Sequence, residues 1–128
     1  MMFDSQGFQG ESFDIIFGVN VLHVAQDLPF SLHELFRHLN EGGMLFLAET
    51  IRPYPNRPMH HEFIFTLLEN YWEVKLDEHV RTQHGFLTKD QWQELFKRAG
   101  FRNIESLTEL ERYDNFSLDV KPLHSFWL

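Results

Sequence analysis

Residues 13–49 decide the fold, and they read FDIIFGVNVLHVAQDLPFSLHELFRHLNEGGMLFLAE. The stretch begins with a nearly continuous apolar run over residues 13–19 and ends with a second one over residues 44–48. Such runs are typical of strands that are covered on both faces of a parallel sheet. Between them, leucine and phenylalanine recur at three- and four-residue spacing. This spacing predicts a helix that begins after Asp27 and buries one face.

Gly42 and Gly43 separate the predicted helix from the second predicted strand. Glycine readily takes the left-handed backbone conformation that ends a helix, so we expect the helix to stop at this pair. Strand, helix and strand together form a βαβ unit of about 36 residues, and its crossover is right-handed in nearly all proteins. We therefore predict two parallel and adjacent strands.

Two more helices are predicted downstream. Three prolines within residues 52–58 indicate an extended loop, and apolar residues at helical spacing then predict a helix over residues 62–72. Thr88 is followed three residues later by Gln91, which is the pattern of a capping box. We expect the helix that begins there to end at Gly100.

The C-terminal tail predicts an antiparallel hairpin. Strand-like stretches occupy residues 102–107 and 116–128, and residues 113–115 between them are typical of a turn. No internal repeat, low-complexity segment or domain boundary interrupts the chain. Residues 1–128 therefore indicate a single α/β domain.

Composition excludes several classes of function. Of the 128 residues, 43% are hydrophobic, which is enough for a buried core, and the formal charge of −8 disfavours nucleic acid as a partner. The absence of cysteine excludes disulfides, thiolate nucleophiles and iron–sulfur sites. No apolar stretch approaches the roughly 20 residues of a membrane helix, and no secretion signal is found. We expect a cytoplasmic protein without a membrane partner.

Two ionisable residues follow the predicted parallel strands at the edge where such sheets bind ligands. His23 comes four positions after Val19, and Glu49 directly follows Ala48. Because neighbouring strands lie roughly 4.8 Å apart, we expect the two side chains to form a hydrogen bond. A carboxylate on one imidazole nitrogen makes the other nitrogen a general base. The alternative is that His23 binds a backbone carbonyl and Glu49 begins a solvated loop.

Other charged residues give weaker indications. His60, His61 and Glu62 invite a metal-site interpretation, but adjacent residues on a helix face different directions. We expect a polar helix start there and no metal. Asp77 and Arg81 are predicted to pair, which would order a loop.

A series of short motifs runs through the chain in a fixed order. They are Gln6-Gly7-Phe8, Ser12-Phe13-Asp14, Asn20-Val21-Leu22-His23, Gly42-Gly43, Leu47-Ala48-Glu49 and Phe65-Thr66-Leu67-Leu68-Glu69-Asn70-Tyr71-Trp72. The series continues with Asp77, Arg81, Leu87, Gln91-Trp92 and Ala99-Gly100-Phe101. In their order and spacing these residues resemble the C-methyltransferase domains of polyketide synthases. These domains are class I S-adenosylmethionine-dependent methyltransferases. The resemblance covers residues 5–105.

The resemblance implies a role for His23 and Glu49. His23 would remove a proton from the α-carbon of a β-ketoacyl thioester bound to an acyl carrier protein, and Glu49 would orient it. The enolate would then attack the methyl group of S-adenosylmethionine in line.

The resemblance also implies binding residues. Gly18, Asn20 and Val21 would lie beside the methionine end of the cofactor. Tyr71 and Trp72 would help to cover the acyl pocket. From helical spacing alone, these two aromatics favour a place in the core.

One departure from the family is large. Residues 1–128 contain neither the glycine-rich cofactor turn nor the acidic ribose-binding residue of class I enzymes. We therefore expect the C-terminal half of a Rossmann-like methyltransferase fold, inactive by itself. Its strand at residues 13–19 should form an exposed edge that is covered by a second copy or by a complementary N-terminal half.

Two alternatives remain open. The chain could be a non-catalytic interaction or scaffold module that retains the second half of the fold. It could also be half of a nicotinamide-dependent oxidoreductase, although the Tyr and Lys pair at helical spacing that such enzymes use is missing.

Overall fold

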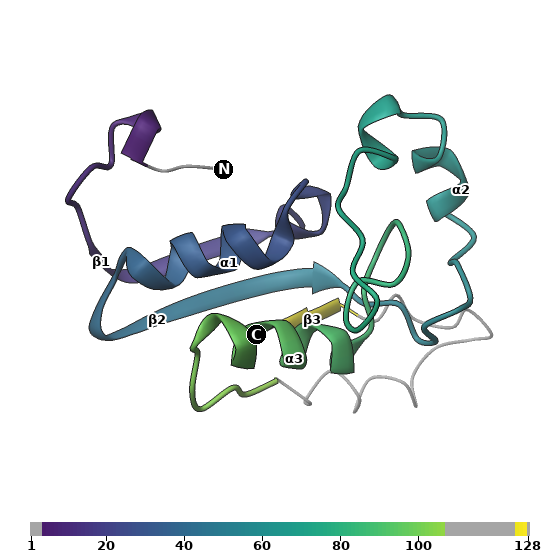
Figure 1. Cartoon of the computed structure of the whole chain (residues 1–128). Helices are drawn as coiled ribbons and strands as arrows, with labels where there is room; N and C mark the ends of the chain where they lie inside the picture. Colours follow the sequence, from purple (N-terminus) through teal and green to yellow (C-terminus); the bar gives the residue numbers. More distant parts are fainter. Residues whose placement is uncertain (1–3, 107–124, 128) are drawn as a thin grey trace.

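The computed structural model describes residues 4–106 and 125–127. Figure 1 shows the arrangement of the elements along the chain. In chain order these are η1 (Asp4–Gln6), β1 (Phe13–Val19), η2 (Leu22–Val24), α1 (Leu28–Arg37), β2 (Leu39–Thr50), α2 (Glu62–Phe65), η3 (Glu69–Tyr71), α3 (Lys89–Ala99) and β3 (Ser125–Trp127).

The sheet has the strand order β1-β2-β3. β1 pairs with β2 in parallel, with Ile16 opposite Leu45 and Val19 opposite Ala48, and β3 pairs with β2 antiparallel. The predicted parallel βαβ unit is confirmed. Both parallel strands end at the same edge, so the residues that follow them meet there.

Local capping residues fix the start of α1 and both ends of α3 as predicted. Asp27 accepts a hydrogen bond from the backbone N–H of Phe30 at 3.1 Å at the start of α1. Thr88 and Gln91 form the reciprocal capping box of α3. Gly100 ends α3 with a φ of 104°, a conformation that costs glycine little.

The core lies on one face of the sheet. Apolar side chains of α1, β2 and α3 form a single buried cluster, in which Trp92 of α3 is fully enclosed. In Figure 1, α1 and α3 run along β2. Inward-facing residues of the sheet, Ile16 and Leu45 among them, pack against this cluster.

The opposite face of the sheet is apolar and exposed. Ile15 pairs with Met44 and Phe17 with Phe46, and all four side chains are solvent-accessible. Among the described strands, β1 pairs only with β2 and forms an edge. The exposed edge along residues 13–19 is therefore confirmed.

The structure corrects the prediction at Gly42 and Gly43. α1 ends at Arg37, and β2 already begins at Leu39, so both glycines lie within the strand. The register shifts on the opposite strand near Phe13, and a Cβ on Gly43 would approach the Phe13 carbonyl to 3.0 Å. The glycines therefore permit close backbone contact at an irregular strand start.

The single helix predicted over residues 62–72 is also wrong. The segment forms the four-residue α2 and, after a break, the 3-10 turn η3. Several of its large apolar side chains face solvent, so no layer within the described ranges packs on a longer helix. Of the predicted hairpin, residues 102–106 form no strand, and residues 107–124 lie outside the described ranges. No helix in the described ranges is long and apolar enough to cross a bilayer.

Candidate functional site

The candidate site begins where β1 turns away from the sheet. The backbone N–H of Asn20 donates to the Ala48 carbonyl at 2.6 Å, which extends the contact with β2 by one residue. Asn20 then takes a φ of 51°, a left-handed conformation that asparagine tolerates better than most residues. Its side-chain oxygen accepts a hydrogen bond from the Thr50 hydroxyl at 3.1 Å. This turn brings η2 over the end of β2.

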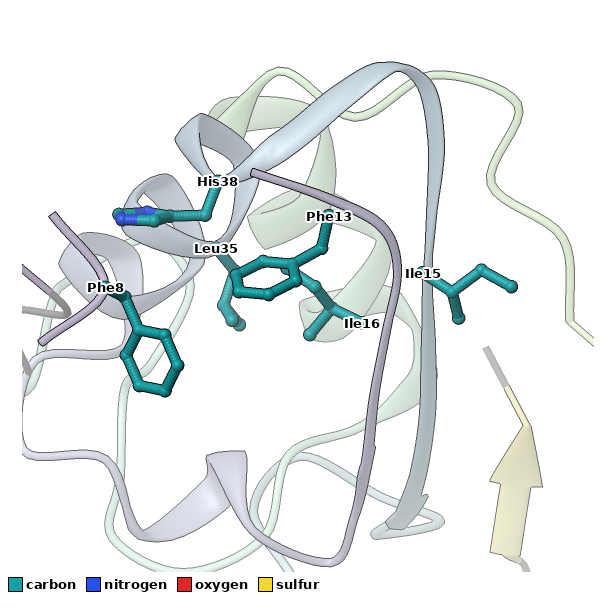
Figure 2. A pocket seen from close by; sticks show the side chains of 6 residues that line it. All are labelled: Phe8, Phe13, Ile15, Ile16, Leu35 and His38. Atoms are coloured by element: carbon teal, nitrogen blue, oxygen red, sulfur yellow. The ribbon is translucent and has the colours of Figure 1, made fainter. Parts of the chain in front are cut away.

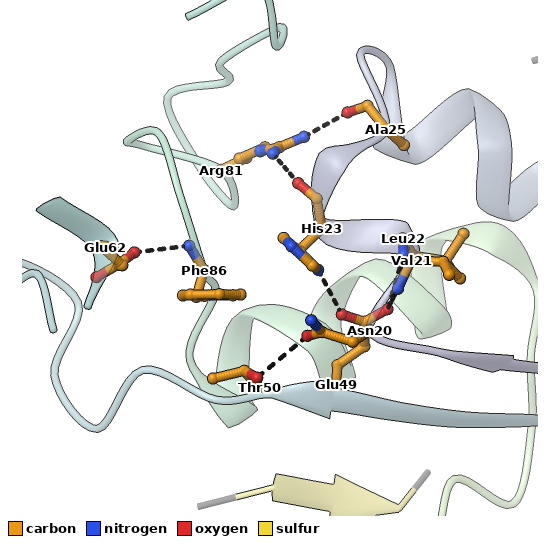
Figure 3. Close-up of polar contacts among 10 residues, drawn as sticks. All are labelled: Asn20, Val21, Leu22, His23, Ala25, Glu49, Thr50, Glu62, Arg81 and Phe86. Carbon is orange, nitrogen blue, oxygen red and sulfur yellow. Dashed lines mark hydrogen bonds and ion pairs between the residues drawn. The ribbon is translucent and has the colours of Figure 1, made fainter. Parts of the chain in front are cut away.

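Glu49 binds both the ring and the backbone of the turn that carries His23. Its Oε2 lies 2.8 Å from Nδ1 of His23, and its Oε1 accepts from the backbone N–H groups of Val21 at 2.9 Å and Leu22 at 2.7 Å (Figure 3). The Glu49 side chain is only 1% exposed. The predicted contact between His23 and Glu49 is confirmed.

This hydrogen bond determines what the imidazole can do. An ionised carboxylate only accepts hydrogen bonds, so Nδ1 carries the proton, and Nε2 of the neutral ring is left with a lone pair. In the described part of the chain, no hydrogen-bond partner is found for Nε2. An imidazole held in this tautomer can accept a proton at Nε2.

Phe86 packs against the His23 ring. Its ring centroid lies 4.6 Å from that of His23, and the His61 ring lies 5.6 Å away from Phe86. The backbone N–H of Phe86 donates to Oε1 of Glu62 at 2.9 Å, which fixes the ring in place.

The predicted pairing of the Asp77 and Arg81 side chains is wrong. The Asp77 carboxylate accepts from the backbone N–H groups of His79 and Val80, which hold its pKa below the usual value. The Arg81 guanidinium instead donates to the carbonyls of His23 at 2.5 Å and Ala25 at 2.7 Å. Its burial lowers the pKa of Arg81 to about 10.

Glu62 is committed to an ion pair. Its carboxylate contacts the Arg52 guanidinium at 2.5 Å, and both side chains are 1% exposed. The pair ties α2 to the segment that follows β2. Within the described ranges, no group of three or more potential metal-binding side chains lies together, His60 and His61 included.

The residues predicted to contact a cofactor lie at the end of β1. Asn20 and Val21 are exposed there. Gly18 is approached closely from inside the chain, since a Cβ at this position would lie 2.9 Å from Cγ2 of Val21. A side chain at position 18 would therefore displace the Val21 side chain.

Tyr71 lies near the buried Glu62 carboxylate, and Trp72 packs against Tyr71. Their rings contact each other and both face His84, with centroids at 6.0 and 5.0 Å from it. Burial, with the nearby Glu62 carboxylate, raises the pKa of Tyr71. Trp72 is exposed and donates from its indole nitrogen to the Thr66 carbonyl at 3.0 Å.

An apolar cavity of about 250 Å³ lies away from His23. Figure 2 shows it at the amino end of β1, with Phe8, Phe13 and Leu35 around it. His38 also lines it, and its Nδ1 contacts the Glu34 carbonyl at 2.8 Å. The cavity is therefore at the opposite end of β1 from the candidate base.

Sequence reasoning missed Arg81, Phe86 and the pair of Arg52 with Glu62 as parts of the site. Arg81 and Phe86 lie in an irregular loop whose sequence has no helical or strand periodicity. Arg81 binds backbone carbonyls, which every residue type has, so the sequence does not indicate its partners. The sequence signal that could have pointed to these residues is the concentration of polar and aromatic residues in the loop around Gly85.

Comparison with known proteins gives a consistent result. Residues 2–106 match the sequence profile of the methyltransferase domain family. The chain is 33% identical over 103 residues, 80% of its length, to the hybrid PKS-NRPS synthetase buaA of Petromyces alliaceus. It is 32% identical over 120 residues, 94% of its length, to the lovastatin nonaketide synthase mokA of Monascus pilosus. The matches span only 2% and 4% of these two relatives.

Solved structures share the fold. The CurJ carbon methyltransferase superposes with a TM-score of 0.74 at 28% identity, over 97% of this chain and 31% of that one. The DszA carbon methyltransferase gives a TM-score of 0.70 at 26% identity, over 95% and 29%. The trans-methyltransferase CalH, solved in complex with SAH, gives 0.64 at 26% identity, over 79% and 26%.

The polyketide synthase resemblance is therefore confirmed, and the α/β architecture is part of a class I methyltransferase fold. The chain spans about a third of the carbon methyltransferase structures that it matches. With the profile covering residues 2–106 and the parallel strands superposing on these enzymes, the chain belongs to the methyltransferase domain family.

Proposed function

We propose that this chain supplies the general base of an S-adenosylmethionine-dependent C-methyltransferase of the polyketide synthase type. Its substrate is a β-ketoacyl thioester on an acyl carrier protein, methylated at the α-carbon. The observation that carries the proposal is the 2.8 Å contact between His23 Nδ1 and Glu49 Oε2, which leaves Nε2 as the base.

The chemistry of this substrate suits a histidine base. The α-carbon lies between a ketone and a thioester, so the enolate left by proton removal is delocalised over both carbonyls. His23 Nε2 takes the proton, and the Glu49 carboxylate stabilises the imidazolium that forms. When bound, S-adenosylmethionine would supply an electrophilic methyl group to the enolate carbon and would leave as S-adenosylhomocysteine.

This chain offers only part of a cofactor site. Asn20 and Val21 are exposed at the end of β1 and, with Gly18, can contact the methionine end of the cofactor. Residues 1–128 contain no glycine-rich turn that could hold its other end. We therefore assign the remaining contacts to a complementary N-terminal segment or chain.

Titration of the chain with S-adenosylmethionine tests whether this chain supplies only part of the cofactor site. We expect no tight binding in isothermal titration calorimetry, because three residues at one strand end bury little of the ligand. A nanomolar Kd for the 128-residue chain would contradict it.

Aromatic side chains of this chain offer an apolar surface on which the acyl group can lie. Tyr71 stacks on His84, and the Trp72 ring is tilted against it. Phe65 lies 5.9 Å from Phe86 between ring centroids. Phe86 connects Phe65 to the imidazole of His23. We assign this aromatic group to one side of the acyl pocket.

A chimeric domain provides the test of function. This chain replaces the matching third of the CurJ carbon methyltransferase, and methyl transfer to a β-ketoacyl pantetheine thioester is followed by mass spectrometry. We expect His23→Ala to abolish transfer while circular dichroism stays unchanged. The matched control is His33→Ala, which removes an exposed histidine of α1. Full turnover by His23→Ala would remove His23 from the mechanism.

The exposed apolar face of β1 and β2 favours a second candidate, a non-catalytic interaction module. In that case a chimera that folds and binds S-adenosylmethionine would show no transfer even with His23 and Glu49 intact.

A further inference from the structure

The turn η2, which carries His23, is held at both of its ends by charged side chains. At its amino end, the Glu49 carboxylate accepts from the backbone N–H groups of Val21 and Leu22. At its carboxyl end, the Arg81 guanidinium donates to the carbonyls of His23 and Ala25. Figure 3 shows the two charged groups on opposite sides of the His23 ring. The turn is therefore clamped between an anion and a cation.

These carbonyls need an external partner. The last carbonyls of a helical turn have no partner within the turn, so they bind water, a side chain or a following N–H group. Ala25 closes the turn with a 2.9 Å bond from its N–H to the Leu22 carbonyl. The carbonyls of His23 and Ala25 are then left to Arg81, one on each of its two terminal nitrogens.

Arg81 is buried in an unusual setting. Its side chain is 1% exposed, and within residues 4–106 and 125–127 no carboxylate lies within ion-pair distance of it. A buried cation without a counter-ion is costly unless its hydrogen bonds are well made. Only the planar guanidinium offers two donors at fixed spacing, because a lysine ammonium is a single point.

The backbone around Arg81 is anchored to the core. The Arg81 carbonyl accepts from the backbone N–H of Asp77 at 2.9 Å. The preceding Val80 carbonyl accepts from the side-chain amide of Gln91 at 2.6 Å, which connects the loop to α3. The Arg81 side chain therefore holds the turn against a segment that is itself fixed to the core. The carbonyl of His23 that it binds lies 58 residues earlier in the chain.

We infer that Arg81 is a positioning residue, which fixes the direction of the His23 imidazole by capping the carboxyl end of η2. The inference rests on the proposed role of His23 as the base. Among the described residues, Arg81 hydrogen-bonds only to backbone carbonyls, so it takes no part in proton transfer. Its loss frees one end of the turn, so the ring no longer stays aligned with both Glu49 and the substrate.

The Nδ1 proton of His23 reports on this alignment. In the ¹⁵N-histidine-labelled 128-residue chain, we expect a downfield Nδ1–H resonance from the bond to Glu49, observed by NMR well below the melting temperature. Arg81→Ala should broaden or abolish this signal, and added ethylguanidinium should restore it. Arg81→Lys should give a partial signal, since one ammonium cannot span both carbonyls in the same geometry. If the Arg81→Ala variant does not fold, the signal of Arg81→Lys tests the inference in its place.

Arg102→Ala is the matched control, because it removes an exposed arginine that follows α3. We expect its His23 signal to equal that of the wild type. A wild-type Nδ1 signal in a folded Arg81→Ala variant would overturn the inference.

Turnover in the chimera separates this inference from the proposed function. Arg81→Lys should lower kcat by about tenfold to a hundredfold at little-changed KM, as expected for a misaligned base. If His23→Ala is inactive while Arg81→Lys keeps full kcat, His23 is the base but Arg81 does not position it. If His23→Ala stays active, the proposed function fails, whatever Arg81 does to the resonance.

Discussion

Phe17 and Phe46 lie opposite each other in the register of β1 and β2, and both rings are exposed. Phe17 is 76% accessible, although it occupies a strand next to a buried core. Together with Ile15 and Met44 they form one apolar face without a covering layer in the described ranges. A sheet with one bare apolar face and an open edge has a strong tendency to associate.

We therefore expect the isolated chain to self-associate. Sedimentation velocity should show species larger than a monomer, and the double variant Phe17→Glu/Phe46→Lys should shift them towards the monomer. Leu32→Ala, a buried change in α1, should destabilise the fold without producing a soluble monomer. A clean wild-type monomer would mean that another part of the chain covers this face.

Glu49→Gln should separate the two contacts that Glu49 makes. The amide oxygen of Gln can still accept from Val21 and Leu22, so the turn should remain folded. Its amide nitrogen, however, would face Nδ1 of His23 and favour the tautomer with the proton on Nε2, which cannot act as a base. We expect kcat in the chimera to fall by roughly 10²- to 10⁴-fold with little change in KM.

The measurement is the initial rate of methyl transfer, with circular dichroism as the check on folding. The matched control is Glu94→Gln, an exposed carboxylate on α3, which should leave the rate unchanged. A Glu49→Gln variant with wild-type kcat would show that the tautomer of His23 is not set by this carboxylate.

The contact between His23 and Glu49 could be predicted because it follows from backbone topology. Two apolar runs with a helix between them imply adjacent parallel strands, and parallel strands bring their following residues to one edge. The partners of Arg81 could not be predicted in the same way. They are backbone carbonyls of a segment far away in sequence, which any residue type would offer.

The wrong predictions at Gly42 and Gly43 and over residues 62–72 also arise because tertiary contacts decide the local structure. The backbone freedom of Gly42 and Gly43 suits a helix end and an irregular strand start equally well, and only contact with Phe13 decides between them. Residues 62–72 have helical apolar spacing, but a helix of this length needs a packed face to be stable. In the structure that face is exposed, and two short turns form instead.

Gly85→Ala should destabilise the fold through the site itself. Gly85 has a φ of 88°, and a Cβ there would lie 2.3 Å from Oε1 of Glu62 and 2.8 Å from the Tyr71 hydroxyl. Backbone strain alone costs about 1–3 kcal/mol, and displacement of the buried Glu62 carboxylate adds to it.

Chemical denaturation of Gly85→Ala and Gly42→Ala measures the two contributions. Gly42 also has a positive φ, of 78°, but nothing lies within 4 Å of a Cβ at that position. The smaller loss expected for Gly42→Ala gives the backbone contribution, and the difference gives that of the crowded site. Equal losses of unfolding free energy in the two variants would show that the Glu62 carboxylate moves aside at no cost in stability.

Acid should weaken the fold through Asp27 and Asp77. The side-chain bond from Lys75 is the main cause of the low pKa of Asp27, and the N–H groups of Val80 and His79 lower that of Asp77. Both carboxyls therefore bind protons less readily in the folded than in the unfolded chain, where their pKa is near 3.8. Their stabilisation is complete above that pKa and is lost as the pH falls through the lower folded values.

Thermal melts between neutral pH and about pH 2 test this dependence. The melting temperature should be flat near neutrality and should fall steeply below the unfolded pKa. Asp77→Asn should melt at a lower temperature than the wild type at neutral pH, because the amide caps Val80 less strongly than a carboxylate does. The two curves should converge in acid, where the wild-type carboxyl is also neutral. Parallel curves at all pH values would mean that the charge of Asp77 does not stabilise this loop.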